Sequence, residues 1–318
     1  LVPGAGRLVA AAARALRRRA ARARRVVSPK LLVFGRTGQV ARALAAAPGP
    51  FDAVFAGRDR LDLSTASPDI AGLVGAERPA AVVNLAAYNA VDSAERDGEA
   101  CRRLNAQAPA RMAQACLALD IPFVHFSTDY VFDGEKGAPY VEPDARAPVN
   151  AYGRAKADGE DALAALAAKG ARLAVIRTAW IFAPGGGGFL GAMIKLAAES
   201  DEARVVADQW GSPTPAAACA EGALVLVRAL LDRDARAEGV FHAAGRDGVS
   251  RADFAEAIFR RLPKRPRLTR LASADYPAAA VRPRDTRLSS AGFESAFGWR
   301  APGLDEWLDR TLAELAPP

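Results

Sequence analysis

The sequence predicts a doubly wound α/β fold, in which helices cover both faces of a parallel sheet, followed by a smaller C-terminal lobe. Short apolar runs alternate with longer helix-forming stretches, and the first apolar run ends at a glycine-containing turn. The 318-residue chain is long enough for a large domain and a modest one. Its composition, 51% hydrophobic and 25% charged, is that of an ordinary globular protein.

The strands and helices follow one another in a regular order. The first apolar run, residues 31–34, stops at Gly35 as a buried parallel strand does. Strand–helix alternation of the kind that follows predicts right-handed crossovers between parallel strands. The further strands are expected at 51–56, 81–83, 123–126 and 172–176, and the helices at 40–47, 70–77, 93–119 (with a break near Pro109) and 152–168.

The pattern loosens after residue 177, where a glycine run at 184–188 and several later prolines interrupt it. We therefore expect residues 30–177 to form the sheet domain and residues 178–318 to form the smaller lobe. The apolar run at 240–243 could rejoin the main sheet, in which case the two parts would be partly interleaved.

The positive charge of the chain is concentrated at its start. Residues 1–30 hold nine of the 43 basic side chains and none of the 36 acidic ones, so the remainder is close to neutral. We expect residues 1–29 to be a basic extension, disordered or loosely helical, and the only segment that could touch an anionic membrane. A nearly neutral fold argues against a nucleic-acid partner. The three cysteines lack metal-binding spacing, which predicts no metal site and a reducing, cytoplasmic location.

The first strand runs into Gly35-x-x-Gly38-x-x-Ala41, a shortened form of the dinucleotide-binding fingerprint. Gly35 allows the tight turn, Gly38 lets the backbone approach a diphosphate, and Ala41 lets the helix pack closely on the strand. The start of the helix then offers free N–H groups to the phosphates. Alone, this motif is weak, because a glycine turn also joins strands to helices in proteins that bind no nucleotide.

The end of the second strand should lie beside the adenosine ribose of such a cofactor. Arg58 could pair with a 2′-phosphate through its planar guanidinium, which favours NADPH. Asp59 leaves NADH as an alternative, because NAD sites commonly place a carboxylate on the ribose 2′-hydroxyl. Asp62 and Leu63 fall where a contact with adenine is expected.

A Tyr152-x-x-x-Lys156 pattern opens the helix expected at 152–168. Residues four apart project from one helical face, and a neighbouring ammonium would lower the pKa of the phenol from its usual ~10. Tyr152 could then give a proton to a carbonyl oxygen. Thr128 closes a preceding strand at the edge where ligands bind in such sheets, and it could hydrogen-bond the same oxygen.

With these motifs the chain resembles the extended short-chain dehydrogenases/reductases and, more closely, the dTDP-4-dehydrorhamnose reductase family. The resemblance implies a Rossmann domain and the reduction of the C4 ketone of dTDP-4-dehydro-L-rhamnose by NADPH to give dTDP-L-rhamnose. The matching stretches are GRTGQV (35–40), NLAAYNAVDSAE (84–95), LNAQAP (104–109), STDYVFDG (127–134), PVNAYGRAKADGE (148–160), RTAWIF (177–182), DQWGSPT (208–214) and YPAAAVRPRDTRL (276–288).

The resemblance also implies roles for single residues. Thr128, Tyr152 and Lys156 would be catalytic. Residues around the cofactor would be Gly35, Thr37, Gly38, Gln39, Val40, Asp62, Leu63, Ala86, Ala87 and Tyr88. Residues around the sugar nucleotide would be Tyr130, Trp180, Gln209 and Arg282, although Trp180 could also be a core aromatic and Arg282 part of a surface ion pair.

The sequence departs from the family pattern at a few positions. Ala41 replaces a usual glycine, Leu85 a usual alanine, and Asp285 a common asparagine. Ala43 stands where some relatives carry a glutamate tied to a magnesium-bridged dimer, so we expect no such metal.

Three other functions are alternatives for this sequence. Sugar-nucleotide dehydratases of the superfamily commonly place Asp-Glu after the threonine, whereas Thr128 is followed here by Asp129 and Tyr130. An epimerase is a second alternative. The third is a non-catalytic regulatory subunit resembling the beta subunit of methionine adenosyltransferase, which would bind NADPH without oxidising it.

Overall fold

The computed structural model of this protein describes residues 28–47, 49–185 and 187–315. All but the last two residues of the expected basic extension, 1–29, therefore lie outside the described residues. In the part that is described, every helix is too short or too polar to cross a lipid bilayer.

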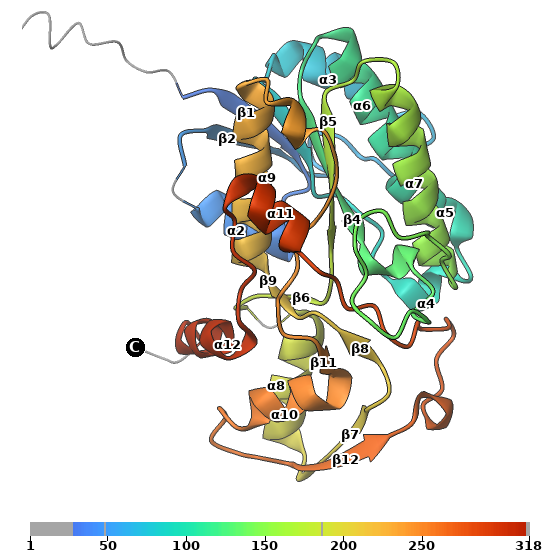
Figure 1. Cartoon of the computed structure of the whole chain (residues 1–318), viewed down its shortest axis with the longest axis vertical. Helices are drawn as coiled ribbons and strands as arrows, with labels where there is room; N and C mark the ends of the chain where they lie inside the picture. The colour runs from blue at the N-terminus through green and yellow to red at the C-terminus, as the bar shows by residue number, and fades with distance from the viewer. Residues whose placement is uncertain (1–27, 48, 186, 316–318) are drawn as a thin grey trace, which may run out of the picture.

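A six-stranded parallel sheet forms the centre of the larger part of the molecule, in the order β2-β1-β3-β4-β5-β10 (Figure 1). The doubly wound fold expected from the sequence is confirmed, and the run near 240–243 does rejoin the main sheet, beside β5. The strands are β1 (Lys30–Phe34), β2 (Asp52–Ala56), β3 (Ala81–Asn84), β4 (Phe123–Thr128), β5 (Leu173–Thr178) and β10 (Gly239–His242).

Helices cover both faces of this sheet because both faces are apolar. Leu31 and Val33 of β1 pack on one side, with α2 (Gln39–Ala46) and α9 (Ala216–Leu231). The alternate residues of the same strand pack on the other side, with helices α3, α6 and α7. A strand that is buried on both faces reads as a continuous apolar run, which is why the sequence marked these strands clearly. The helices of the second face are α3 (Ile70–Glu77), α6 (Ala108–Ala118) and α7 (Ala151–Ala167).

The helical stretch expected at 93–119, with a break near Pro109, consists instead of four pieces. Asp97 interrupts it by accepting a hydrogen bond from the backbone N–H of Ala100, which starts a new helix. Pro109 lies in the first turn of α6, where its missing N–H is tolerated, so it starts a helix and does not break one. The pieces are α4 (Val91–Ala94), α5 (Gly98–Arg102), a π-helical turn (Arg103–Gln107) and α6.

The smaller lobe lies at the end of the sheet where the parallel strands have their carboxyl ends (Figure 1). Its core surrounds Phe254, which stacks with Phe189 and contacts Phe182. Its elements are α8 (Gly188–Glu199), β7 (Glu202–Val206) paired with β12 (Arg267–Leu271), α10 (Arg251–Phe259) and α12 (Leu304–Ala313), with the short strands β6 (Ile181–Phe182), β8 (Trp210–Gly211), β9 (Thr214–Pro215) and β11 (Val249–Ser250).

The chain passes between the two parts several times. After β5 it enters the lobe, returns to the sheet through α9, β10 and, later, α11 (Ala291–Phe297), and in between forms α10 and β12 in the lobe. Strand order reverses between β1 and β3, and ligands of such sheets bind in the crevice outside the strand ends at this reversal. The lobe therefore faces the edge at which a ligand is expected.

Candidate active site

Two adjoining cavities lie at the carboxyl ends of the strands, with volumes of about 690 and 330 Å³. They form one cleft, because the residues after β3 and at the start of α2 line both. The shared residues are Gly38, Leu85, Ala86, Ala87 and Asn89.

The backbone around the larger cavity is held in place by close contacts. Gly35 has a φ of +96°, and a Cβ added there would lie 2.9 Å from the backbone nitrogen of Ala86. Asn84 accepts a hydrogen bond from that same Ala86 N–H, and its side-chain amide contacts His125. The loops after β1 and β3 are thereby fixed against each other, and together they form the floor of the cleft.

The far end of the larger cavity is rich in charged side chains. Arg58, Asp62 and Leu63 line it, as expected from the sequence, together with Gly35 and Thr37 of the first loop. Arg36 also lines this cavity, and its guanidinium forms an ion pair of 2.7 Å with Asp59. The one sequence feature that could have pointed to Arg36 as a lining residue is its place directly after Gly35, within the dinucleotide-binding fingerprint.

The residues of the cleft fit a bound dinucleotide. Gly38 directly precedes helix α2, and no side chain caps the free N–H groups at the start of this helix, which leaves them for a phosphate. The buried Oε1 atom of Gln39, which lines the smaller cavity, has no hydrogen-bond partner among the described residues. A polar ligand in the cleft would satisfy these groups.

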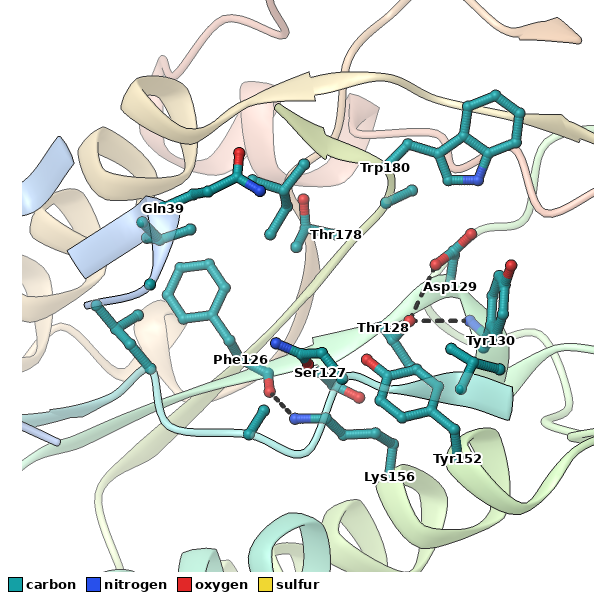
Figure 2. A pocket seen from close by; sticks show the side chains of 18 of the residues that line it. Gln39, Phe126, Ser127, Thr128, Asp129, Tyr130, Tyr152, Lys156, Thr178 and Trp180 are labelled. Carbon is teal, nitrogen blue, oxygen red and sulfur yellow. Dashed lines mark hydrogen bonds between the residues drawn. The ribbon is translucent and has the colours of Figure 1, made fainter. Parts of the chain in front are cut away.

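The smaller cavity brings together Thr128, Tyr152 and Lys156 (Figure 2). Asn150 caps the start of α7 by accepting a hydrogen bond of 2.8 Å from the backbone of Gly153. A Cβ at Gly153 would lie 2.2 Å from the carbonyl oxygen of Tyr130, so only glycine lets α7 approach the turn after β4 this closely. This approach is what places the phenol of Tyr152 beside the end of strand β4.

Burial dominates the electrostatics of this trio. It raises the pKa of Tyr152 above its usual value, and a hydrogen bond with Thr128 offsets only part of the rise. Burial lowers the pKa of Lys156 to about 8, with partial compensation from the carboxylate of Glu160. The lowering of the Tyr152 pKa by Lys156 that we expected from the sequence is not seen here, and the Lys156 ammonium donates to the carbonyl of Phe126 at 2.8 Å.

Asp129 is a buried carboxylate beside Thr128, Tyr152 and Lys156, the three residues expected to be catalytic. The Thr128 hydroxyl donates to one of its oxygens at 3.0 Å and the Thr286 hydroxyl donates to the other. Burial raises the pKa of Asp129 to about 6, and these hydrogen bonds limit the rise. In the sequence this residue stood out only because no second carboxylate follows it.

The residues expected around the sugar nucleotide do not all line the cavity. Tyr130 and Trp180 do, and Figure 2 shows both on the side of the pocket opposite Gln39. Gln209 lies elsewhere, with its side chain donating to Ser273 at 3.0 Å. Arg282 is also outside the lining and pairs with Asp92.

Tyr88, expected beside the cofactor, is likewise absent from the lining of both cavities. Its backbone N–H and C=O groups exchange hydrogen bonds of 3.0 Å with the side chain of Asn105, in the π-helical turn. The Tyr88 side chain packs beside Cys101 and Ala155.

Arg251, at the start of α10, lines the cavity without any sequence motif to mark it. Its guanidinium lies over the indole of Trp180, 3.6 Å from the ring centroid. This contact depends on the return of the chain from β10 into the lobe. Local sequence patterns therefore do not predict that Arg251 lines the cavity.

Comparison with known proteins assigns the family. The model of the RmlD substrate binding domain matches residues 29–316. The chain is 40% identical over 285 residues to a dTDP-4-dehydrorhamnose reductase of Burkholderia thailandensis, a match covering 86% of this chain and 94% of that protein. It is 35% identical over 292 residues to the corresponding protein of Sinorhizobium fredii, a match covering 90% of this chain and 97% of that protein.

Solved structures of the same family share the fold. A dTDP-4-dehydrorhamnose reductase from Clostridium acetobutylicum has a TM-score of 0.82 and 30% identity, covering 90% of this chain and 99% of that one. The reductase of Bacillus anthracis, solved in complex with NADP, has a TM-score of 0.80 and 28% identity, covering 91% and 100%. Sequence and structure agree over nearly the whole described chain, and the chain belongs to the dTDP-4-dehydrorhamnose reductase family.

Proposed function

We propose that this protein reduces the C4 ketone of dTDP-4-dehydro-L-rhamnose with NADPH, giving dTDP-L-rhamnose. The relatives that carry this name support the substrate, and the Bacillus anthracis reductase solved with NADP supports the cofactor. The observation that carries the proposal is the convergence of Thr128, Tyr152 and Lys156 in a cavity continuous with a dinucleotide cleft.

The chemistry assigns one task to each member of the trio. Bound NADPH supplies a hydride to C4 of the sugar. The Tyr152 hydroxyl gives its proton to the ketone oxygen, so that the carbonyl becomes an alcohol, and the Thr128 hydroxyl positions that oxygen. Lys156, held by the carbonyl of Phe126, supplies a cation near the tyrosinate that remains.

The cofactor would lie along the cleft with its adenosine at the charged end. The guanidinium groups of Arg36 and Arg58 favour the 2′-phosphate of NADPH, and Asp59 leaves NADH as a second cofactor. We assign cofactor binding to residues 30–177 and sugar-nucleotide binding mainly to residues 178–318.

Two further assignments rest on the same cleft and core. Tyr130 and Trp180, which line the catalytic cavity, are proposed to contact the sugar. We place the enzyme in the cytoplasm, because Cys101, Cys116 and Cys219 are free, buried thiols of the kind a reducing compartment preserves.

A coupled assay tests the proposal. The protein is given NADPH, dTDP-4-keto-6-deoxyglucose and the 3,5-epimerase that converts this sugar, and the loss of NADPH absorbance is followed. Oxidation that requires both the sugar and the epimerase supports the reductase. Tight NADPH binding without oxidation would instead favour a regulatory subunit, and oxidation without the epimerase would point to a different keto-sugar.

A further inference from the structure

Of the two cations that line the proposed catalytic cavity, Arg251 has neither a carboxylate nor a carbonyl partner for its side chain within the described residues. Lys156 and Arg251 are the basic residues of the cavity lining, and the ammonium of Lys156 is bound by the carbonyl of Phe126. Arg251 takes part in none of the ion pairs found within residues 28–47, 49–185 and 187–315. A positive charge withdrawn from bulk water is costly unless an anion compensates it.

The position of Arg251 is fixed by the structure around it. It is the first residue of α10, directly after Ser250, which forms a reciprocal capping box with Asp253. Its backbone N–H donates to the carbonyl of Gln209 at 3.0 Å. Its guanidinium stacks on Trp180 and lies 5.2 Å from the ring centroid of Phe189.

Trp180, the stacking partner, is itself held in one place. It has a φ of +44°, a conformation that a bulky residue adopts only under constraint from its surroundings. A Cβ at Gly211 would lie 2.3 Å from the indole, so the ring packs directly on that backbone. Stacking occupies the flat faces of the guanidinium and the indole. One of the in-plane donors of Arg251 reaches the hydroxyl of Tyr130, and the other in-plane N–H groups are left to donate to a ligand.

Arg282, the other arginine near this cavity, is already satisfied. Its two terminal nitrogens donate to both carboxylate oxygens of Asp92, and one of them also donates to the carbonyl of Ala280. The carboxylate of Asp129, which lines the same cavity, accepts hydrogen bonds from two threonines. Arg251 is thus the arginine left with unused donors at the cavity wall.

We propose that Arg251, stacked on Trp180, binds the diphosphate of the sugar nucleotide. This inference rests on the proposed function, because that function places the ketone of the sugar at Tyr152. The ketone carbon, C4, lies opposite the anomeric carbon in a pyranose ring, so a ketone at Tyr152 places the diphosphate on the far side of the sugar. Tyr130 lies between Tyr152 and Arg251. The centroid of its ring is 6.0 Å from that of Tyr152, and its hydroxyl is near Arg251.

Nucleotide binding to the full-length protein tests the proposal without requiring turnover. Dissociation constants for dTDP, dTMP and thymidine are measured by calorimetry, in the presence of NADP⁺, for the wild type and for Arg251→Gln and Arg251→Lys. A charge-assisted pair with a phosphate is worth about 1.5–3 kcal/mol, so Arg251→Gln should weaken dTDP about ten- to a hundredfold while leaving thymidine unchanged. Arg251→Lys should retain part of the dTDP affinity.

The control is Arg260→Gln, because Arg260 is exposed at the other end of the same helix and should not affect any of these ligands. Unchanged dTDP affinity in Arg251→Gln would overturn the proposal. So would equal losses for dTDP and thymidine in both variants, since Arg251 would then act only by shaping the pocket. If the protein binds dTDP through Arg251 but does not oxidise NADPH in the coupled assay, the proposed function is wrong and this inference still stands.

Discussion

At the scale of single residues, the proposed proton donor of the reduction, Tyr152, is a buried tyrosine. Burial raises the pKa of Tyr152, so the phenol keeps its proton at neutral pH, as a donor must. The tyrosinate left after transfer needs a nearby cation, and Lys156 lies one helical turn away on the same face of α7. Burial lowers the pKa of Lys156 to about 8, so its supporting charge is lost as pH rises past that value.

Replacing Tyr152 with phenylalanine should remove the proton donor and little else. The phenylalanine ring can keep the edge contact that Tyr152 makes with Tyr130, so the shape of the pocket should be unchanged. NADPH binding should therefore remain close to that of the wild type. General acid catalysis contributes about 10²–10⁴-fold, and the single-turnover rate of NADPH oxidation should fall by a similar factor. A variant that keeps more than about half of the wild-type rate would show that another group supplies the proton.

Asp129 should make the stability of the protein depend on pH. Burial raises its pKa to about 6 from the ordinary 3.8, so the folded state binds this proton more tightly than the unfolded chain. The stabilisation is complete below about pH 4 and is lost as pH rises through about 6. The free energy of unfolding of the wild type minus that of Asp129→Asn should therefore fall by up to about 3 kcal/mol over this range.

Urea denaturation between pH 4 and 7 measures this difference. The variant Asp275→Asn, at an exposed carboxyl group, is the matched control and should leave the pH profile of stability unchanged. Parallel profiles for the wild type and Asp129→Asn would contradict the raised pKa.

At the scale of elements, the contact between α7 and the turn after β4 fixes the position of Tyr152, the proposed proton donor. Gly153 makes this contact possible, because a Cβ there would lie 2.2 Å from the carbonyl oxygen of Tyr130 and 3.0 Å from the side chain of Pro148. The clash would involve backbone atoms, which cannot move aside cheaply. Any relief must shift α7, and with it the phenol of Tyr152.

Gly153→Ala should therefore reduce both stability and activity. Overpacking of this kind costs about 1–3 kcal/mol, and a displacement of about 1 Å at a reacting group can cost about 10²-fold in rate. Gly75→Ala is the control, since Gly75 lies inside α3 with nothing within 4 Å of the added Cβ. That variant should be as active as the wild type and up to about 1 kcal/mol more stable by thermal unfolding. Equal behaviour of the two variants would exclude the steric role of Gly153.

Elements buried on both faces were the easiest to predict from the sequence. The apolar runs of the parallel strands stand out, and the helix expected at 70–77 has those bounds in the structure. The stretch 93–119 was harder, because its break depends on the side chain of Asp97 capping a new helix and on a π-helical turn. A helix-forming composition does not reveal either feature, since both are settled by local hydrogen bonds.

At the scale of the whole molecule, the cleft is assembled from segments far apart in the chain. Most residues proposed to bind the cofactor belong to local motifs, and for this reason their place along the cleft could be predicted. Arg251 reaches the cavity only because the chain returns to the lobe after β10, and Gln209 turns away to bond with Ser273. Sequence patterns predict the strands and helices. The contacts between the lobe and the sheet domain depend on the folded chain, so local patterns do not predict them.

The segment between β12 and α11 connects the lobe to the sheet domain. The contacts that residues 280–282 of this segment make with α4 and α7 are called the anchor here. Asp92 of α4 accepts hydrogen bonds from Arg282 and from the backbone N–H of Ala280, and Asn150 at the start of α7 donates to the carbonyl of Val281 at 2.9 Å. The sequence left two roles open for Arg282, a substrate contact and an ion pair. The ion pair is present, and a double-mutant cycle separates the two roles.

If Arg282 acts through Asp92 alone, then Asp92→Ala, Arg282→Ala and the double variant should raise the KM for the keto-sugar by similar factors. The coupling energy of this partly exposed pair should be about 0.2–1 kcal/mol in the free energy of unfolding, and it should shrink at high salt. If Arg282 also contacts the sugar nucleotide, both variants that lack it should have a higher KM than Asp92→Ala. The dissociation constant for NADPH, measured in all four proteins, should stay constant, because the anchor lies outside the lining of the cofactor cavity.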